Sequence, residues 1–322
     1  MRVGIDVSPL EQTGAGTARH VRGLVAELEG RPGLELSRLT FGASGRAATI
    51  ARDAAWYPAG IARAARNLDV LHCTTMRVPL RARPAIVATV HDVAVLRYPE
   101  AFPVWHRHTG RLALRQAVRS ADAIVAVSAF TRDELAELLG VSGDRVRVVR
   151  NGVDPVFTKG GPAASGDYVL AVGTLEPRKN LARAVDAARL AGVELRVVGA
   201  PDWGGVNVPG WLGRPDDEEL AALYRGARCL VFPSLYEGFG IPILEAMACG
   251  TPVVTSRGGA TEEVAGGAAV LVDPLDAEAI AAGIAEAEHR RADLVPLGRE
   301  RAHEFTWQHA ADEVEALWRE FA

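Results

Sequence analysis

The strongest chemical signal in the sequence is a glycine-rich segment that carries two glutamates, Glu237 and Glu245. It directly follows residues 229–232, an apolar run typical of a buried strand. Gly238 and Gly240 let the backbone come close to a ligand at the start of an expected helix, whose positive end binds phosphate. Carboxylates accept hydrogen bonds from hydroxyls. The segment therefore predicts a site at which two separated carboxylates reach different parts of one nucleotide sugar. The alternative is a glycine-rich turn beside a glutamate that the helix dipole favours.

A second segment places two adjacent cations, Arg178 and Lys179, after an expected strand at 168–172, which Gly173 follows. Positive side chains at a helix N-terminus are electrostatically unfavourable unless an anion lies there. A diphosphate would supply that anion, held by a forked guanidinium and an ammonium. The alternative is a solvated basic turn.

The amino-terminal half offers weaker candidates. His91 ends an expected strand at 85–90, a place where a lone histidine is more often structural than catalytic. Gly14 and Gly16 follow the first strand and would pass near donor phosphates or an acceptor, although a plain turn explains them equally well. They do not form a dinucleotide fingerprint, because Arg19 occupies the third glycine position.

The sequence predicts no metal site. His106 and His108 have no evident third ligand, and no Asp-x-Asp triplet occurs to hold a metal-bound diphosphate. The run from Thr131 to Glu134 has the pattern of a capping box, which is a structural feature.

These residues must be positioned by short apolar runs that alternate with longer helical segments. Ten such runs are expected to be strands: 3–6, 69–72, 85–90, 123–127 and 146–149, then 168–172, 194–198, 229–232, 252–255 and 269–272. This alternation is typical of parallel sheets, which bind ligands at the carboxyl ends of their strands. Two such sheets joined by a hinge predict a cleft site built from both halves.

Length and composition agree with a two-domain enzyme. The chain has 322 residues, which is long for a single core, and 48% of them are hydrophobic. The net charge of −4 is too near zero for a nucleic-acid binder. No spanning segment, signal peptide or disulfide framework is evident, so we expect a cytoplasmic protein whose three cysteines are core thiols.

The matched motifs resemble those of one family. Glu237 and Glu245 fit an E-x7-E signature, Arg178 and Lys179 fit a basic diphosphate pair, and residues 251–259 fit the strand and loop that follow. Together they resemble the retaining nucleotide-sugar glycosyltransferases of family 4. The resemblance is strong over the carboxyl half and looser over the amino half.

This resemblance implies a GT-B fold, in which two doubly wound Rossmann-like α/β domains face each other across a cleft. It divides the chain into an acceptor domain at 1–155, a hinge linker at 156–167, a donor nucleotide-sugar domain at 168–302 and a closing C-terminal helix at 303–322.

Site roles also follow from the resemblance. Glu237 would contact the donor hexose and Glu245 the ribose. Residues 211–214 would lie beside the base, and His91 would lie near the donor sugar. The expected catalytic set is His91, Arg178, Lys179 and Glu237. The expected donor-binding set is Gly14, Gly16, Gly173, Arg178, Lys179, Leu212, Gly213, Gly238, Phe239, Gly240 and Glu245.

The predicted function is metal-independent, retaining transfer of a hexose from a nucleoside-diphosphate sugar to a glycan, glycolipid or small-molecule hydroxyl. No cofactor is expected, and GDP-mannose is favoured over UDP- or dTDP-sugars because the donor motifs resemble those of bacterial mannosyltransferases. Two alternatives stay open: a non-catalytic two-lobed nucleotide- or sugar-binding protein, and an NAD-dependent oxidoreductase on Rossmann units.

Charge is unevenly distributed along the chain. Residues 1–155 hold 21 Arg against 15 Asp and Glu, a net +6, whereas residues 156–322 hold 15 basic against 25 acidic residues, a net −10. Arg107, Arg111, Arg115 and Arg119 recur every fourth residue and are expected to share one helix face. That face would contact an anionic surface, either the inner leaflet of a membrane or a lipid-phosphate acceptor, or be a solvated or internally paired stripe.

Overall fold

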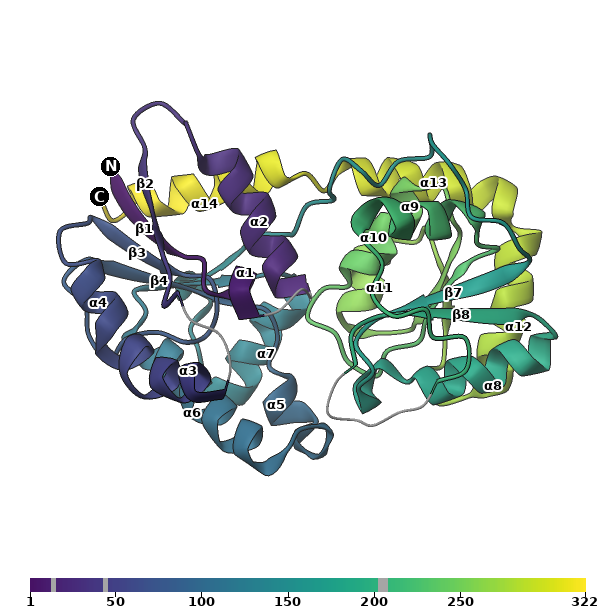
Figure 1. The fold of residues 1–322 in the computed structure, drawn as a ribbon, viewed down its shortest axis with the longest axis horizontal. Coiled ribbons are helices and arrows are strands. Elements are labelled where there is room, and N and C mark those ends of the chain that lie inside the picture. The colour runs from purple at the N-terminus through teal and green to yellow at the C-terminus, as the bar shows by residue number, and fades with distance from the viewer. Residues whose placement is uncertain (13–15, 43–45, 202–207) are drawn as a thin grey trace. The chain divides into compact units, whose positions relative to one another are not determined.

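The structure, a computed structural model, describes residues 1–12, 16–42, 46–201 and 208–322. It contains two compact units, one formed by Met1–Gly152 with Trp307–Ala322 and the other by Val153–Thr306 (Figure 1). Each unit is a parallel sheet with helices on both faces, so the expected doubly wound α/β architecture is confirmed.

The first unit is built on a six-stranded sheet in the order β2-β1-β3-β4-β5-β6. Its strands are β1 (Arg2–Asp6), β2 (Glu35–Leu39), β3 (Val70–Cys73), β4 (Ala85–Val90), β5 (Ala123–Ala126) and β6 (Val146–Val148). Every residue of β3 and β5 is buried, as expected for strands covered on both faces. The strand order reverses between β1 and β3, because β2 lies on the other side of β1.

β2 is not among the strands expected from the sequence. Three of its five residues are polar, and it is an edge strand in which no residue is fully buried. Such a strand lacks the continuous apolar run that reveals the central strands.

The last helix of the chain packs against the first unit. The helical segments of this unit are α1 (Pro9–Gln12), α2 (Gly16–Leu28), α3 (Arg46–Ala51), the π-helix η1 (Arg52–Gly60), α4 (Ile61–Ala64), α5 (Ala94–Arg97), η2 (Pro99–Ala101), α6 (Val104–Ser120), α7 (Ala129–Leu139), η3 (Gly143–Arg145) and α14 (Trp307–Arg319). Trp307, Val314 and Trp318 of α14 share one buried cluster with Val3 and Leu24. The chain therefore returns to its first unit after completing the second.

The second unit has a five-stranded sheet in the order β11-β10-β9-β7-β8. Its elements are β7 (Tyr168–Val172), η4 (Pro177–Lys179), α8 (Leu181–Ala191), β8 (Glu194–Val198), α9 (Asp217–Gly226), β9 (Leu230–Phe232), α10 (Ile241–Ala248), β10 (Val253–Ser256), α11 (Gly259–Ala265), β11 (Val270–Val272), α12 (Ala277–His289) and α13 (Arg291–His303). Here the strand order reverses at β7, which lies between β8 and β9.

Residues 156–167, expected as a linker, are held against the second unit. Arg225 of α9 donates hydrogen bonds to the carbonyl oxygens of Thr158 and Pro162, and the ring of Phe157 packs edge-on against Tyr224. The division between the two units falls between Gly152 and Val153.

The capping box expected at Thr131–Glu134 is wrong. Helix α7 begins at Ala129, and its N-cap is Ser128, three residues before Thr131. The Ser128 hydroxyl accepts a hydrogen bond from the Thr131 N–H. Glu134 instead accepts two short hydrogen bonds from Arg97.

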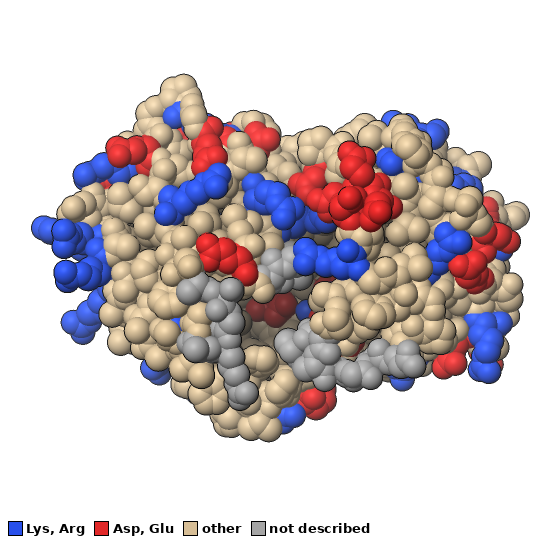
Figure 2. Space-filling model, viewed as in Figure 1, with Lys and Arg blue, Asp and Glu red and all other residues tan. Residues whose placement is uncertain are grey.

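The surface carries both signs of charge. Figure 2 shows arginine side chains along the edge of the first unit near α4, and groups of acidic and basic side chains on the second unit. Across the described ranges, no helix has the length and apolar character needed to cross a bilayer. Cys73, Cys229 and Cys249 are buried free thiols.

The contact between α2 and α14 requires a glycine. A Cβ atom added to Gly23 would lie 2.2 Å from Cδ2 of the Trp307 ring. We predict that Gly23→Ala lowers the free energy of unfolding by about 1–3 kcal/mol, although alanine is normally the better helix former. Urea unfolding measures this change. The matched control is Gly143→Ala, whose added Cβ would meet no atom within 4 Å; equal effects of the two substitutions would contradict the packing argument.

Candidate active site

The reversal of strand order brings the two motifs of the second unit together. Because β7 and β9 are neighbours, the segments that follow them leave the same edge of the sheet. The backbone N–H of Leu235 donates to the carbonyl of Arg178, which joins the two segments directly. In open α/β sheets this position is the usual ligand-binding crevice.

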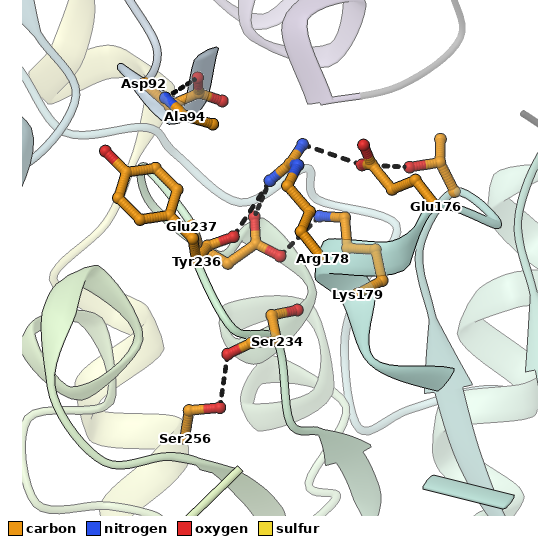
Figure 3. A network of polar contacts seen from close by, with 10 residues as sticks. Asp92, Ala94, Glu176, Arg178, Lys179, Ser234, Tyr236, Glu237 and Ser256 are labelled. Atoms are coloured by element: carbon orange, nitrogen blue, oxygen red, sulfur yellow. Dashed lines mark hydrogen bonds and ion pairs between the residues drawn. The ribbon is translucent and has the colours of Figure 1, made fainter. Parts of the chain in front are cut away.

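A cluster of four charged side chains lies at this position (Figure 3). Nζ of Lys179 lies 2.5 Å from Oε1 of Glu237, and Nη1 of Arg178 lies 3.4 Å from Oε2 of the same carboxylate. On its other side, Arg178 approaches Oε1 of Glu176 to 2.9 Å, and the Thr174 hydroxyl donates to that oxygen. Two cations are therefore balanced by two carboxylates of the protein itself.

Those two carboxylates explain how adjacent cations are accommodated at positions 178 and 179. Arg178 and Lys179 lie in the 3-10 turn η4, before α8 begins at Leu181, and their immediate counter-ions are Glu237 and Glu176. Sequence reasoning expected a bound anion at a helix start and gave Glu176 no role. The signal was present, because an acidic residue two positions before an arginine is a possible ion-pair partner.

The electrostatic state of Glu237 is set by its neighbours. Burial by itself raises the pKa of this carboxyl, but Lys179 and Arg178 outweigh burial and hold the pKa below its ordinary value. Glu237 is therefore ionised at neutral pH. An ionised carboxylate accepts hydrogen bonds from sugar hydroxyls and has no proton to donate.

Asn180 fixes the geometry of the cluster. It is the one residue other than glycine with positive φ among the residues described, at φ 58°. Its buried amide donates to the carbonyls of Pro233 and Pro274, at 2.9 and 2.6 Å. This residue, which the sequence analysis did not single out, ties the loop after β7 to the loops after β9 and β11.

Glu245 and Phe239 lie in packed surroundings. Glu245 is in the second turn of α10, 2% exposed, and accepts a hydrogen bond of 2.9 Å from the Tyr224 hydroxyl. Phe239 is 4% exposed, and its ring packs edge-on against Phe305. Gly240, with φ 110°, allows the sharp entry into α10.

Three further donor candidates meet at the carboxyl end of β8. The Gly199 N–H donates to the Gly213 carbonyl, and a Cβ on Gly199 would lie 1.7 Å from the Gly173 oxygen. Leu212 is 50% exposed beside them. Gly199, which sequence reasoning missed, is thus the residue that lets Gly173 and Gly213 lie at one edge.

The remaining candidates belong to the first unit. Gly14 lies outside the described residues, and Gly16 is the exposed first residue of α2. His91 follows β4, and its Nε2–H donates to the Thr74 carbonyl at 2.9 Å. The ring of His20 lies edge-on to it, with centroids 4.8 Å apart.

Three interior histidines of the first unit are neutral at pH 7: His20, His72 and His91. Burial lowers the pKa of His91 despite the opposing effects of the Thr74 carbonyl and Asp92. Burial likewise lowers the pKa of His72 to about 3, and His72 shares a hydrogen bond with the Thr89 hydroxyl. Charging these rings would place a cation in an apolar sheet.

Comparisons with known proteins place this chain in a family. Residues 156–304 match the model for glycosyl transferases group 1, and residues 14–157 match that for glycosyltransferase family 4. The O-antigen chain mannosyltransferase B of Escherichia coli is 32% identical over 277 residues, covering 76% of this chain and 72% of that protein. The chain belongs to glycosyltransferase family 4.

Two further proteins are similar to this glycosyltransferase, one in sequence and one in structure. The MMP alpha-(1->4)-mannosyltransferase of Mycolicibacterium hassiacum is 32% identical, over 72% of this chain and 64% of that one. Among solved structures, Anabaena HepE in complex with UDP and glucose has a TM-score of 0.78 at 18% identity, covering 99% of this chain and all of HepE. This likeness confirms the GT-B fold.

Glu176 stabilises the charged cluster of the glycosyltransferase. We predict that Glu176→Gln lowers the free energy of unfolding by about 1–3 kcal/mol, because Arg178 loses a buried counter-ion and keeps only Glu237. Chemical denaturation measures the change. Glu194→Gln, which breaks an exposed pair with Arg196, should cost less than about 1 kcal/mol. Equal costs would show that the cluster behaves as surface charge.

The neutral histidines make stability depend on pH. An unfolded chain binds a proton on His72 below about pH 6.5 and the folded chain does not, so stability falls as the pH falls. Between pH 7 and pH 5 we predict that wild type loses ~2 kcal/mol more than His72→Gln in urea unfolding. His309→Gln, which replaces an exposed histidine, should behave like wild type. Parallel losses in all three proteins would contradict the prediction.

Proposed function

We propose that this glycosyltransferase moves a hexose from a nucleoside-diphosphate sugar to a hydroxyl of a glycan, glycolipid or small molecule, with retention of anomeric configuration. GDP-mannose is the favoured donor. The proposal rests on one observation: a buried, ionised glutamate that shares two cations at the crevice where the strand order reverses.

The cluster suits the departure of a diphosphate. When a nucleoside diphosphate leaves the sugar, negative charge grows on its phosphates, and preorganised cations stabilise that charge. Lys179 has three donors, of which Glu237 takes one in this structure, so it can hold the carboxylate and a phosphate oxygen together. Arg178 is already turned between Glu237 and Glu176 and needs no large reorientation.

Glu237 would then act on the sugar. Its ionised carboxylate accepts hydrogen bonds from hexose hydroxyls and orients the ring above the cations. Glu245 would accept hydrogen bonds from the ribose, in exchange for or beside its present bond to Tyr224. His91, held by the Thr74 carbonyl, would approach the sugar from the first unit with its unprotonated Nδ1 as an acceptor.

The names of similar proteins support two parts of the donor proposal, the mannose and the nucleotide sugar. Two relatives at 32% identity are named mannosyltransferases, which favours a mannose donor. HepE, a structural neighbour, was solved with UDP-glucose, which favours a nucleotide-sugar donor in general. Because leaving-group charge is met by Arg178 and Lys179, we propose that transfer needs no metal ion.

A donor panel tests the proposal. We predict that GDP-mannose raises the melting temperature more than UDP- or dTDP-sugars, since a ligand at 100 times its Kd stabilises by about 2.7 kcal/mol. Transfer from GDP-mannose should continue in excess EDTA. Lys179→Ala should weaken GDP binding by about 1–3 kcal/mol and leave GMP binding nearly unchanged.

The matched control for Lys179→Ala is Arg189→Ala, which removes a 78% exposed cation from α8. It should leave both affinities unchanged. Equal losses for GDP and GMP in Lys179→Ala would place Lys179 away from the diphosphate. A metal-dependent rate would overturn the metal-independent mechanism, and a response to UDP-sugars alone would overturn the choice of donor.

A further inference from the structure

Exposed apolar side chains of the first unit gather on α6 and on the loop before β4. Trp105, Leu112 and Val104 of α6 are 70%, 65% and 63% exposed, and Leu80 of the loop is 62% exposed. Large side chains this exposed have no packing role within the unit. Their concentration on one element and its neighbouring loop indicates an interaction surface.

The helix presents these residues together with cations. Trp105, His108, Leu112, Arg115 and Arg119 follow one another at intervals of three and four residues, and all five are exposed. This spacing places them along one side of a helix. The side is therefore apolar toward its N-terminal half and cationic toward its C-terminal half.

The expectation that four arginines of α6 share one face is only partly correct. Each step of four residues turns a helix about 40° beyond a full turn, so Arg107 and Arg119 differ by about 120°. Arg107 and Arg111 are partly buried, and the Arg107 guanidinium donates to the Phe102 carbonyl. Only Arg115 and Arg119 of the four lie fully on the exposed side.

The loop before β4 extends the same surface. The side chain of Gln116 donates to the Pro79 carbonyl, and the Ser120 hydroxyl donates to the Leu80 carbonyl. These bonds hold the loop beside the C-terminal half of α6, where exposed Leu80 and Arg81 join Arg115 and Arg119. We call Leu80, Arg81, Trp105, Leu112, Arg115 and Arg119 the α6 face.

The charge of the α6 face is uncompensated. Residues 76–84 and 101–121 contain seven arginines and no aspartate or glutamate. Within the part of the chain that the structure describes, no acidic side chain pairs with Arg81, Arg115 or Arg119. A surface that joins unpaired cations to exposed tryptophan and leucine suits a partner that is anionic at its surface and apolar just beneath.

We propose that the α6 face docks the first unit on an anionic lipid bilayer. The 17-residue α6 (Figure 1) would lie in the plane of the interface. Trp105, Leu112 and Leu80 would enter the headgroup region, and Arg81, Arg115 and Arg119 would meet lipid phosphates. The proposal is independent of the donor sugar and would bring the enzyme to an acceptor carried by lipid.

Vesicle co-sedimentation of the full chain tests the proposal. Vesicles of phosphatidylcholine with 30% phosphatidylglycerol should bind the protein, and pure phosphatidylcholine vesicles should not. Each arginine near an anionic leaflet contributes about fivefold to partitioning, so Arg115→Glu with Arg119→Glu should reduce binding at least ~20-fold. Raising NaCl from 0.05 to 0.5 M should release the wild type.

Two further variants separate lipid docking from general charge. Trp105→Ala with Leu112→Ser should reduce binding at least tenfold. Arg189→Glu with Arg290→Glu, which change an exposed and a partly exposed arginine of the second unit, should leave it unchanged. Circular dichroism verifies that each variant is folded. Absence of binding, equal binding to neutral vesicles, or equal losses in both arginine pairs would overturn the proposal, as would self-association that the α6 variants abolish without any lipid binding.

Discussion

The ion pair of Lys179 with Glu237 is the interaction around which the charged cluster of the second unit is organised. A carboxylate that is 9% exposed would pick up a proton if left alone, because desolvation disfavours its charge. Lys179 and Arg178 keep Glu237 ionised by pairing with it. Glu176 is a second partner of Arg178, whose guanidinium is therefore shared between two carboxylates. Removal of Glu237 would leave Lys179 without its buried partner, and removal of Glu176 would leave Arg178 with one carboxylate in place of two. Losses of this kind cost more than breaking an exposed pair. The cluster is thus both a structural unit and a preorganised set of charges.

Backbone topology delivers these four side chains to one place. The strand-order reversal at β7 makes neighbours of two segments that are about 55 residues apart in sequence, and Asn180 secures them through two carbonyls. Asn180 adopts a left-handed conformation that costs roughly 1 kcal/mol for a residue with a side chain, and asparagine tolerates this better than most residues. The strain is offset by the hydrogen bonds of its amide.

The interior of the first unit is held by hydrogen bonds of neutral side chains and by aromatic packing. Its polar interior holds neutral histidines whose rings are fixed by a carbonyl, a hydroxyl and an asparagine oxygen, and α14 closes the core with two buried tryptophans. Its outer surface carries arginine without compensating acid along α6. The two units therefore differ in how their charges are arranged: the cluster of the second unit is buried and balanced, whereas the charge along α6 of the first unit is exposed and unbalanced.

The sequence by itself determined the fold class and the motifs, because buried parallel strands leave continuous apolar runs and because the family signature is local in sequence. Of the eleven strands that the structure describes, it determined ten, including the edge strands β6, β8 and β11, and missed β2, whose mostly polar residues resemble a surface segment. The basic pair and Glu237 were visible as residues. What only the tertiary structure decided was their pairing, the roles of Glu176, Asn180 and Gly199, and which of the four α6 arginines face outward. These depend on contacts between segments far apart in the chain and on which side of α6 packs against the unit, and neither is encoded in any local pattern of residue types.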